Sequence, residues 1–195
     1  MSAPWPAPRP SGPLDAVVAL PGSKSQTNRL LVLAALAPGR SVVRRPLRSR
    51  DTELMAGALR VLGVGVTDDG DDWVVDGVGG PLAPTGDRVD VGNAGTVARF
   101  LPPVAALATS PVTFDGDPRV RERPLGPLLL ALRSLGVALS GVDGLPVTVS
   151  GTGAVRGGQV EVDATQSSQL VSGLLLAGPR FDEGLVVTHA GAVPS

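Results

Sequence analysis

Short apolar runs recur along the chain at intervals of roughly 70 residues, and each run leads into a polar loop. The runs are Val17–Leu20, Arg88–Val91 and Val160–Val162. Each run has the length and composition of a strand, and the hydroxylated or small residues of the loop behind it favour a helix N-terminus. The chain is therefore predicted to contain three related blocks, each of which begins with a strand, a loop and a helix.

The first helix of each block is predicted at Leu30–Ala37, Val97–Ala108 and Leu170–Ala177. The first and third of these segments carry no charge, and a helix that is apolar nearly all round is expected to be buried at the centre of the domain. The pair Pro102-Pro103 lies inside the second segment and is expected either to kink that helix or to end it early.

Each block continues with a strand, and the first two blocks then add an amphipathic helix and two further strands, whereas the third block stops just after its second strand. The two amphipathic helices end in similar sequences that lead into Gly63 and Gly136, where a left-handed C-terminal cap is expected. The further strands are predicted at Ser41–Arg44, Val64–Val66, Trp73–Val75, Val112–Phe114, Val137–Leu139, Pro146–Val149 and Leu185–Thr188. The pattern indicates an α/β (α+β) fold of βαβαββ units packed with pseudo-threefold symmetry. Its equivalent loops, around Lys24, Gly95 and Ser167, are expected to converge at one end.

Composition narrows the classes of function. The 195 residues have a formal net charge of -1, which gives no global attraction to nucleic acid. The absence of cysteine and the single histidine, His189, disfavour thiolate metal sites and Ser-His triads. No apolar run reaches the length of a membrane span, so cytoplasmic residence is expected by default. Residues 1–14 are rich in proline and are expected to be extended or disordered, and residues 15–195 are expected to form the folded domain.

The loop Gly22–Arg29 is the first candidate site. Lys24 is the only lysine in the chain, and it is flanked by hydroxylated residues at a helix start, where anions bind. The alternative interpretation is a capped helix whose lysine is solvated. The loop is not a Walker A motif, because Ser23 stands where that motif requires glycine.

Arginines form the second group of candidates. Arg29 and Arg99 occupy corresponding places near the start of their helices, where a positive charge opposes the helix dipole unless an anion is bound. Arg119, Arg121 and Arg123 form the densest positive cluster, with Arg48 and Arg50 as its counterpart one block earlier. Most members of such a cluster are expected to be solvated, and one or two to contact a carboxylate or phosphate.

Four ordered motifs resemble those of the 3-phosphoshikimate 1-carboxyvinyltransferase (EPSP synthase) family. They are Leu20-Pro-Gly-Ser-Lys-Ser with Asn28-Arg29, Gly92-Asn-Ala-Gly-Thr with Arg99, Arg119 through Pro124, and Ser167-Ser-Gln169. The resemblance covers residues 15–195. It implies the enolpyruvyl transferase fold, in which each of two domains is an inside-out α/β barrel of three βαβαββ units and the active site lies between the domains.

The resemblance also implies the roles of particular residues. Lys24, Ser25 and Arg29 would contact the 3-phosphate of shikimate 3-phosphate, and Lys24 would also reach phosphoenolpyruvate. Gly95 and Arg123 would line the phosphoenolpyruvate site. Shikimate 3-phosphate would further contact Ser167, Ser168, Gln169 and Ser195, with Gln169 also approaching phosphoenolpyruvate. Neither a metal nor an organic cofactor is implied.

Length is the one departure from the family, whose members are roughly twice as long. We expect the chain to be an N-terminal fragment that lacks the C-terminal domain with the acid/base residues, and therefore to hold no catalytic residue and to be inactive alone. Two alternatives stay open. The related UDP-N-acetylglucosamine 1-carboxyvinyltransferase usually has Lys-Asn in place of Lys24-Ser25 and a reactive cysteine, and a non-catalytic anion-binding module could carry the same repeat.

Overall fold

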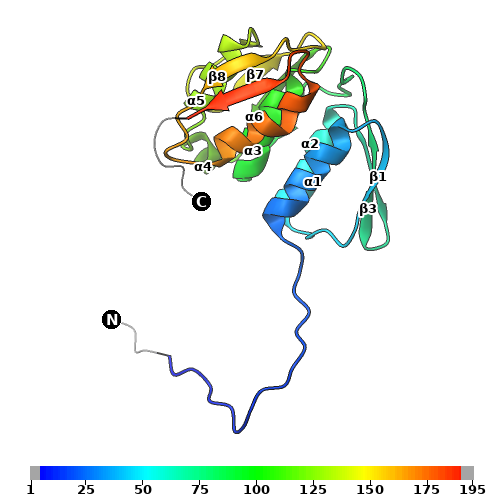
Figure 1. Cartoon of the computed structure of the whole chain (residues 1–195), viewed down its shortest axis with the longest axis vertical. Helices are drawn as coiled ribbons and strands as arrows, with labels where there is room; N and C mark the ends of the chain where they lie inside the picture. Colours follow the sequence, from blue (N-terminus) through cyan, green and yellow to red (C-terminus); the bar gives the residue numbers. More distant parts are fainter. Residues whose placement is uncertain (1–4, 190–195) are drawn as a thin grey trace.

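The computed structural model of the protein describes residues 5–189, which form helices and short strands in alternation (Figure 1). The helices are α1 (Lys24–Leu36), α2 (Arg50–Val61), α3 (Gly95–Ala105), α4 (Pro118–Arg121), α5 (Gly126–Ser134), α6 (Gln169–Ala177) and the 3-10 turn η1 (Gly178–Arg180). The strands are β1 (Gly39–Val43), β2 (Gly65–Asp69), β3 (Asp72–Gly77), β4 (Arg88–Asp90), β5 (Pro111–Asp115), β6 (Ala138–Leu139), β7 (Val147–Ser150), β8 (Gly158–Glu161) and β9 (Leu185–Thr188). Residues 5–22 form neither helix nor strand, and Figure 1 shows this segment leading away from the folded body.

The three sheets follow the predicted blocks. The second block has the strand order β4-β5-β7-β6, with β4 parallel to β5, and the third block pairs β8 with β9 in the same parallel sense. The first block has the order β1-β3-β2 and lacks a counterpart of β4. The strand predicted at Val17–Leu20 is therefore wrong. The apolar side chains of this run are exposed, and no described strand pairs with it, so its backbone groups have no ladder to join.

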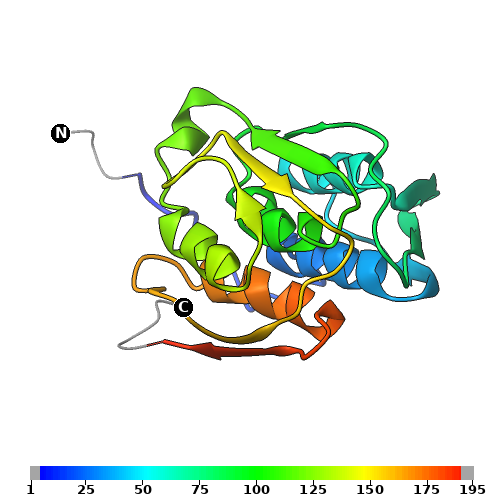
Figure 2. The same cartoon turned by 90° about the horizontal axis from the view of Figure 1, so that it is seen from above.

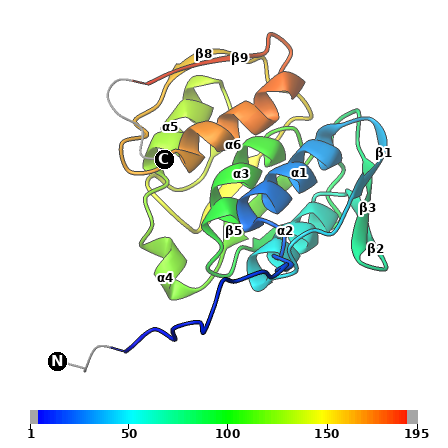
Figure 3. The same cartoon turned by 60° about the horizontal axis from the view of Figure 1, so that its bottom comes forward.

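The first helices of the three blocks, α1, α3 and α6, lie side by side (Figure 3). Every residue of α3 is buried, as predicted. The prediction holds only in part for α1 and α6, because Leu30, Leu33 and Leu175 are each about half exposed. The α3 helix passes through Pro102-Pro103 and ends at Ala105, earlier than predicted. The view in Figure 2 shows β9 running alongside α6 on the outside of the molecule.

The two predicted C-terminal caps are confirmed. Gly63 and Gly136 have φ values of +88° and +84°, which a residue without a Cβ adopts at little cost. At Gly63 the requirement is also steric, since a Cβ would lie 2.1 Å from the carbonyl oxygen of Ala83.

Arg180 joins the third block to the first. Its guanidinium donates to the carbonyl oxygens of Leu36 at 2.6 Å and Val78 at 2.7 Å, and to those of Gly79 and Gly80 at 2.8 and 3.0 Å. Leu36 is the last residue of α1, where free carbonyls and the helix dipole both favour a positive charge. One side chain therefore closes the ring of blocks without a carboxylate partner.

Replacing Arg180 is expected to destabilise the fold. The change Arg180→Ala removes the donor from the partly buried carbonyls of Leu36 and Val78 and from the exposed carbonyls of Gly79 and Gly80, and we expect a loss of about 3 kcal/mol in the free energy of unfolding. Urea titration followed by circular dichroism measures it. Arg156→Ala is the matched control, since Arg156 pairs only with Glu183 at the surface, and equal losses in the two variants would contradict this role of Arg180.

Candidate functional site

A cavity of about 600 Å³ opens where the N-terminal ends of α1, α3 and α6 meet. It is lined by Lys24, Arg50, Asp51, Asn93, Gly95, Thr96, Arg99, Arg123, Pro124, Gln166, Ser167 and Gln169. The predicted convergence of the loops around Lys24, Gly95 and Ser167 is confirmed. Four of the lining side chains are cationic and one is a carboxylate, so the cavity has the character of an anion site.

The lysine of the cavity stands in the first turn of α1. Ser23 caps this helix, its hydroxyl accepting from the backbone N–H of Gln26 at 3.4 Å. Lys24 Nζ lies 2.9 Å from Asp51 Oδ2 of α2, and the lysine side chain is 53% exposed. An ion pair this open to water contributes about 1 kcal/mol or less, so Lys24 can exchange Asp51 for a ligand at low cost.

Arg99 is buried beneath the cavity without a carboxylate. Its contacts are long and go to neutral acceptors: Gly95 O and Pro124 O at 3.4 Å and Gln169 Oε1 at 3.3 Å. Its Nε has no partner among the described residues. Burial lowers the pKa of Arg99, and the charge of Arg123 lowers it further. This under-satisfied guanidinium would gain from an anion nearby.

Gly95 lies between two guanidinium groups. A Cβ at this position would stand 2.7 Å from Nη1 of Arg99 and equally close to Nη1 of Arg123. Arg123 Nη2 in turn donates to Asn93 Oδ1 at 3.0 Å. The missing side chain therefore lets two positive groups and the first turn of α3 surround one small volume.

Asp115 stabilises the segment of the chain that leads to Arg123. Its carboxylate is buried and accepts from Nε and Nη2 of Arg121 at 2.9 and 2.8 Å and from Nη2 of Arg88 at 2.9 Å. The Arg121 hydrogen bond, the Gly116 N–H and the charges of both arginines hold the pKa of Asp115 below its usual range, although burial opposes them. Arg121 therefore anchors the short helix α4, which Arg123 follows.

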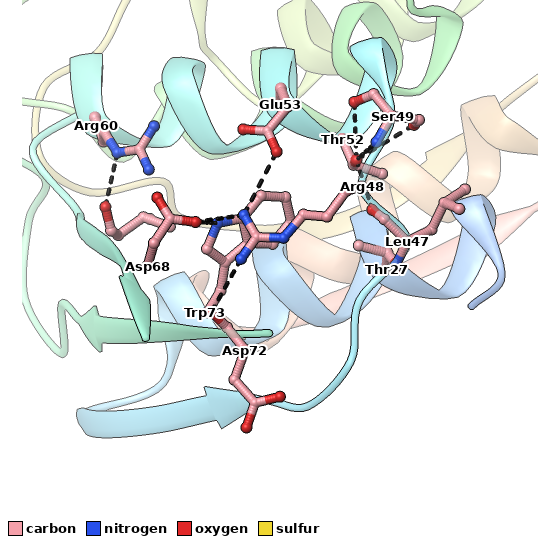
Figure 4. A network of polar contacts seen from close by, with 11 residues as sticks. Thr27, Leu47, Arg48, Ser49, Thr52, Glu53, Arg60, Asp68, Asp72 and Trp73 are labelled. Carbon is pink, nitrogen blue, oxygen red and sulfur yellow. Dashed lines mark hydrogen bonds and ion pairs between the residues drawn. The ribbon is translucent and has the colours of Figure 1, made fainter. Parts of the chain in front are cut away.

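Arg48 and Arg50, the counterpart one block earlier of the densest arginine cluster, have different partners. Arg48 packs over the ring of Trp73 at 3.9 Å, pairs with Asp68 at 2.5 Å and reaches Glu53 at 3.4 Å, so that it ties α2 to the β2–β3 hairpin (Figure 4). Arg50 lines the cavity and pairs with Asp117 at 3.0 Å. The cluster is thus partly a structural network and partly a site.

A second cavity of about 700 Å³ lies on the Arg48 side of the molecule. It is lined by Leu20–Gly22, by the segment 44–48 and by Gly70 and Asp71. Although this cavity is larger, its Arg48 is held by Asp68 and Trp73. The cavity at Gly95 has the stronger claim to a ligand, because residues of all three predicted loops line it.

The structure brings together most of the residues predicted to bind ligand. Lys24, Gly95, Arg123, Ser167 and Gln169 line the cavity, and their binding roles stay predictions. Ser25, Arg29 and Ser168 are not among its lining residues, and Ser195 lies outside the described residues.

Ser25 and Arg29 instead form part of the α1 scaffold. Arg29 donates to the carbonyl and hydroxyl oxygens of Ser25 and to Ser172 Oγ at 3.0 Å, and it packs over the ring of Phe100. These contacts hold Arg29 directly beside the cavity wall formed by α1.

Several lining residues were not assigned to the site from sequence. Arg99 was among the arginine candidates, because it stands where Arg29 stands in the first block, but no ligand was assigned to it. Thr96 and Asn93 lie in a motif that was recognised, and Gln166 precedes another. Asp51 carries no signal of its own, since an acidic residue in the first turn of a helix is common.

Among the described residues no group of three His, Cys, Asp or Glu side chains could hold a metal ion, and none of the described helices is long and apolar enough to cross a membrane.

Comparisons with known proteins agree with one another. The family model described as EPSP synthase (3-phosphoshikimate 1-carboxyvinyltransferase) matches residues 8–195. A curated 3-phosphoshikimate 1-carboxyvinyltransferase of Mycobacterium ulcerans (strain Agy99) is 55% identical over 193 residues, which are 97% of this chain and 44% of that protein. Two solved structures of EPSP synthase from Acinetobacter baumannii match with TM-scores of 0.80 and 0.79 at 27% and 28% identity, each over 91% of this chain and 41% of the other. The chain thus spans less than half the length of these relatives.

The clearance at Gly95 can be tested with inorganic phosphate as the probe. In Gly95→Ala the added methyl group must displace Arg99 or Arg123, and we expect phosphate to bind about tenfold more weakly by calorimetry. Gly57→Ala is the control, because a Cβ at this helical position meets nothing within 4 Å. Equal affinity in wild type and Gly95→Ala would contradict the crowding.

The Asp115 cluster predicts a pH dependence. Because the folded pKa of Asp115 is depressed, its stabilisation is fully present above the unfolded pKa of about 3.9 and is lost as the pH falls through the folded value. Asp115→Asn is expected to be less stable than wild type at neutral pH, with a smaller gap below about pH 3.5. Urea titrations across pH 2–7 measure this, and a constant gap would contradict it.

Proposed function

The chain belongs to the EPSP synthase family, and we propose that it forms one wall of an active site that transfers the enolpyruvyl group of phosphoenolpyruvate to the 5-hydroxyl of shikimate 3-phosphate. The observation that supports the proposal is the cavity itself. Lys24, Gly95, Arg123 and Gln169 come from four separate segments of the chain and line one space of about 600 Å³.

Both substrates are anionic, and the cavity offers cations that are weakly committed. Lys24 can leave its exposed pair with Asp51, and Arg99 has only long contacts with neutral acceptors. We assign Lys24 to the 3-phosphate of shikimate 3-phosphate and also to phosphoenolpyruvate, and we assign Gly95 and Arg123 to phosphoenolpyruvate. Ser167, Ser168 and Gln169 are assigned to shikimate 3-phosphate, with Gln169 also approaching phosphoenolpyruvate. Arg29 and Ser25, which bond to one another beside the cavity, would turn toward the 3-phosphate when it binds.

The reaction adds the 5-hydroxyl, which loses its proton, to the enol carbon of phosphoenolpyruvate and protonates the methylene to a methyl group. Phosphate is then expelled as a proton leaves that methyl group, which restores the double bond. Fixed positive groups stabilise the charge that develops on the phosphate and carboxylate oxygens during these steps. Proton transfer needs an acid and a base, and among the described residues Asp51, already paired with Lys24, is the one carboxylate that lines the cavity. We infer that this wall binds substrate and that the acid/base groups come from the part of the family's length that this chain does not match.

The binding role of Lys24 can be tested directly. Isothermal titration of the chain with shikimate 3-phosphate is expected to show binding that weakens at least about tenfold in Lys24→Ala, because the substitution removes the cation that we assign to the 3-phosphate. Arg40→Ala is the control, since Arg40 of β1 pairs with Asp76 of β3 and does not line the cavity. The side chain of Arg40 is 70% exposed. An affinity unchanged by Lys24→Ala would sink the assignment.

The absence of turnover is a separate prediction. The chain alone is expected to release no phosphate from phosphoenolpyruvate in the presence of shikimate 3-phosphate, because the cavity offers no free acid/base pair. A coupled phosphate assay measures this. A rate above the protein-free background would show that the described wall suffices for the chemistry.

A further inference from the structure

Three consecutive side chains of α1 each join this helix to a different part of the cavity end. Thr27 Oγ1 accepts from the N–H of Leu47, just before α2, at 3.0 Å. Asn28 Nδ2 donates to Thr96 Oγ1 of α3 at 2.6 Å, and Arg29 Nη2 donates to Ser172 Oγ of α6 at 3.0 Å. The turn that follows Lys24 is therefore a junction for the other helices.

The Asn28–Thr96 bond is the buried member of this set. Asn28 has no exposed surface and Thr96 is 6% exposed. The second amide atom, Asn28 Oδ1, is also buried and has no partner among the described residues. An unpaired buried acceptor destabilises a fold, and a leucine of similar size would avoid this penalty. The amide therefore needs a reason beyond packing.

The reason lies in what the bond connects. Thr96 directly follows Gly95, whose clearance from the guanidinium groups of Arg99 and Arg123 leaves no room for a methyl group. Asn28 stands one helical turn after Lys24, in the helix that supplies Lys24 to the cavity. A bond of 2.6 Å between these two turns fixes the spacing of the walls, and an error of about 1 Å in such a spacing can cost a factor of roughly a hundred in rate.

We propose that Asn28 is a positioning residue that acts through Thr96 to set the distance between the Lys24 wall and the Gly95 wall of the cavity, and thereby the affinity for the bound anion. Asn28 is not among the residues that line the cavity. The proposal takes the identity of the ligand, shikimate 3-phosphate, from the proposed function.

The decisive variant is the double substitution Asn28→Leu with Thr96→Val, made in the whole chain. Replacing both partners of a buried bond by apolar groups of similar shape is nearly neutral for stability, so we expect a thermal midpoint within about 2 °C of wild type. Shikimate 3-phosphate is expected to bind about tenfold more weakly by calorimetry. If the bond served only folding, the double variant would bind shikimate 3-phosphate with wild-type affinity and unfold at the wild-type temperature. That result would overturn the proposal.

A further variant gives a matched control. Thr148→Val breaks the Thr113–Thr148 hydrogen bond of 2.9 Å between β5 and β7, far from the cavity, and should leave the affinity unchanged. A tenfold loss of affinity in Thr148→Val would show that losing any side-chain hydrogen bond of a threonine weakens binding. That result would also overturn the proposal.

A readout without ligand separates this proposal from the proposed function. The amide of Ala98, which donates to Ala94 O at 3.2 Å at the start of α3, is expected to exchange its hydrogen about tenfold faster in the double variant, because the turn is no longer tied to α1. Wild type that fails to bind shikimate 3-phosphate would refute the proposed function alone. Unchanged exchange at Ala98 would refute the positioning role of Asn28, whatever the ligand.

Discussion

Four positive side chains lie around one cavity at one end of the molecule, and the surrounding structure must hold them close together despite their mutual repulsion. Lys24, Arg50, Arg99 and Arg123 line one cavity with a single carboxylate. Lys24 and Arg50 are paired with Asp51 and Asp117. Arg99 and Arg123 are instead held by neutral acceptors, among them Gln169 Oε1, Asn93 Oδ1 and the Pro124 carbonyl, which do not neutralise their charge. Full neutralisation by carboxylates would have given a more stable protein with nothing left to attract an anion.

Strong contacts around the cavity hold these positive side chains in place. Arg121 and Arg88 converge on the buried Asp115, and Arg48 is held against Trp73, so the arginines that do have strong partners are the ones that brace the segments around the cavity. The three helices that supply the cavity wall are joined at a single turn of α1. Preorganised charges stabilise a developing anion without the cost of rearranging at the moment of reaction.

Local chemistry could be predicted from the sequence, and long-range partners could not. Gly63 and Gly136 were predicted as caps because a helix end needs a residue that tolerates positive φ. Val17–Leu20 has the composition of a strand, yet it remains outside every sheet because a strand exists only where another chain segment offers hydrogen bonds. The motifs and the repeat placed Lys24, Gly95 and Arg123 together, whereas the pairing of Lys24 with Asp51 depends on how α2 packs on α1, which no local pattern encodes.

Arg180 has a consequence for the order in which the molecule is made. It lies 144 residues after Leu36 and about 100 after the other carbonyls that it binds. During synthesis the C-terminal end of α1 therefore leaves the ribosome long before its counter-charge exists, and contacts of such high separation form late because the loop between them must close first. The first block should thus remain an incomplete folding unit until the third block has been translated.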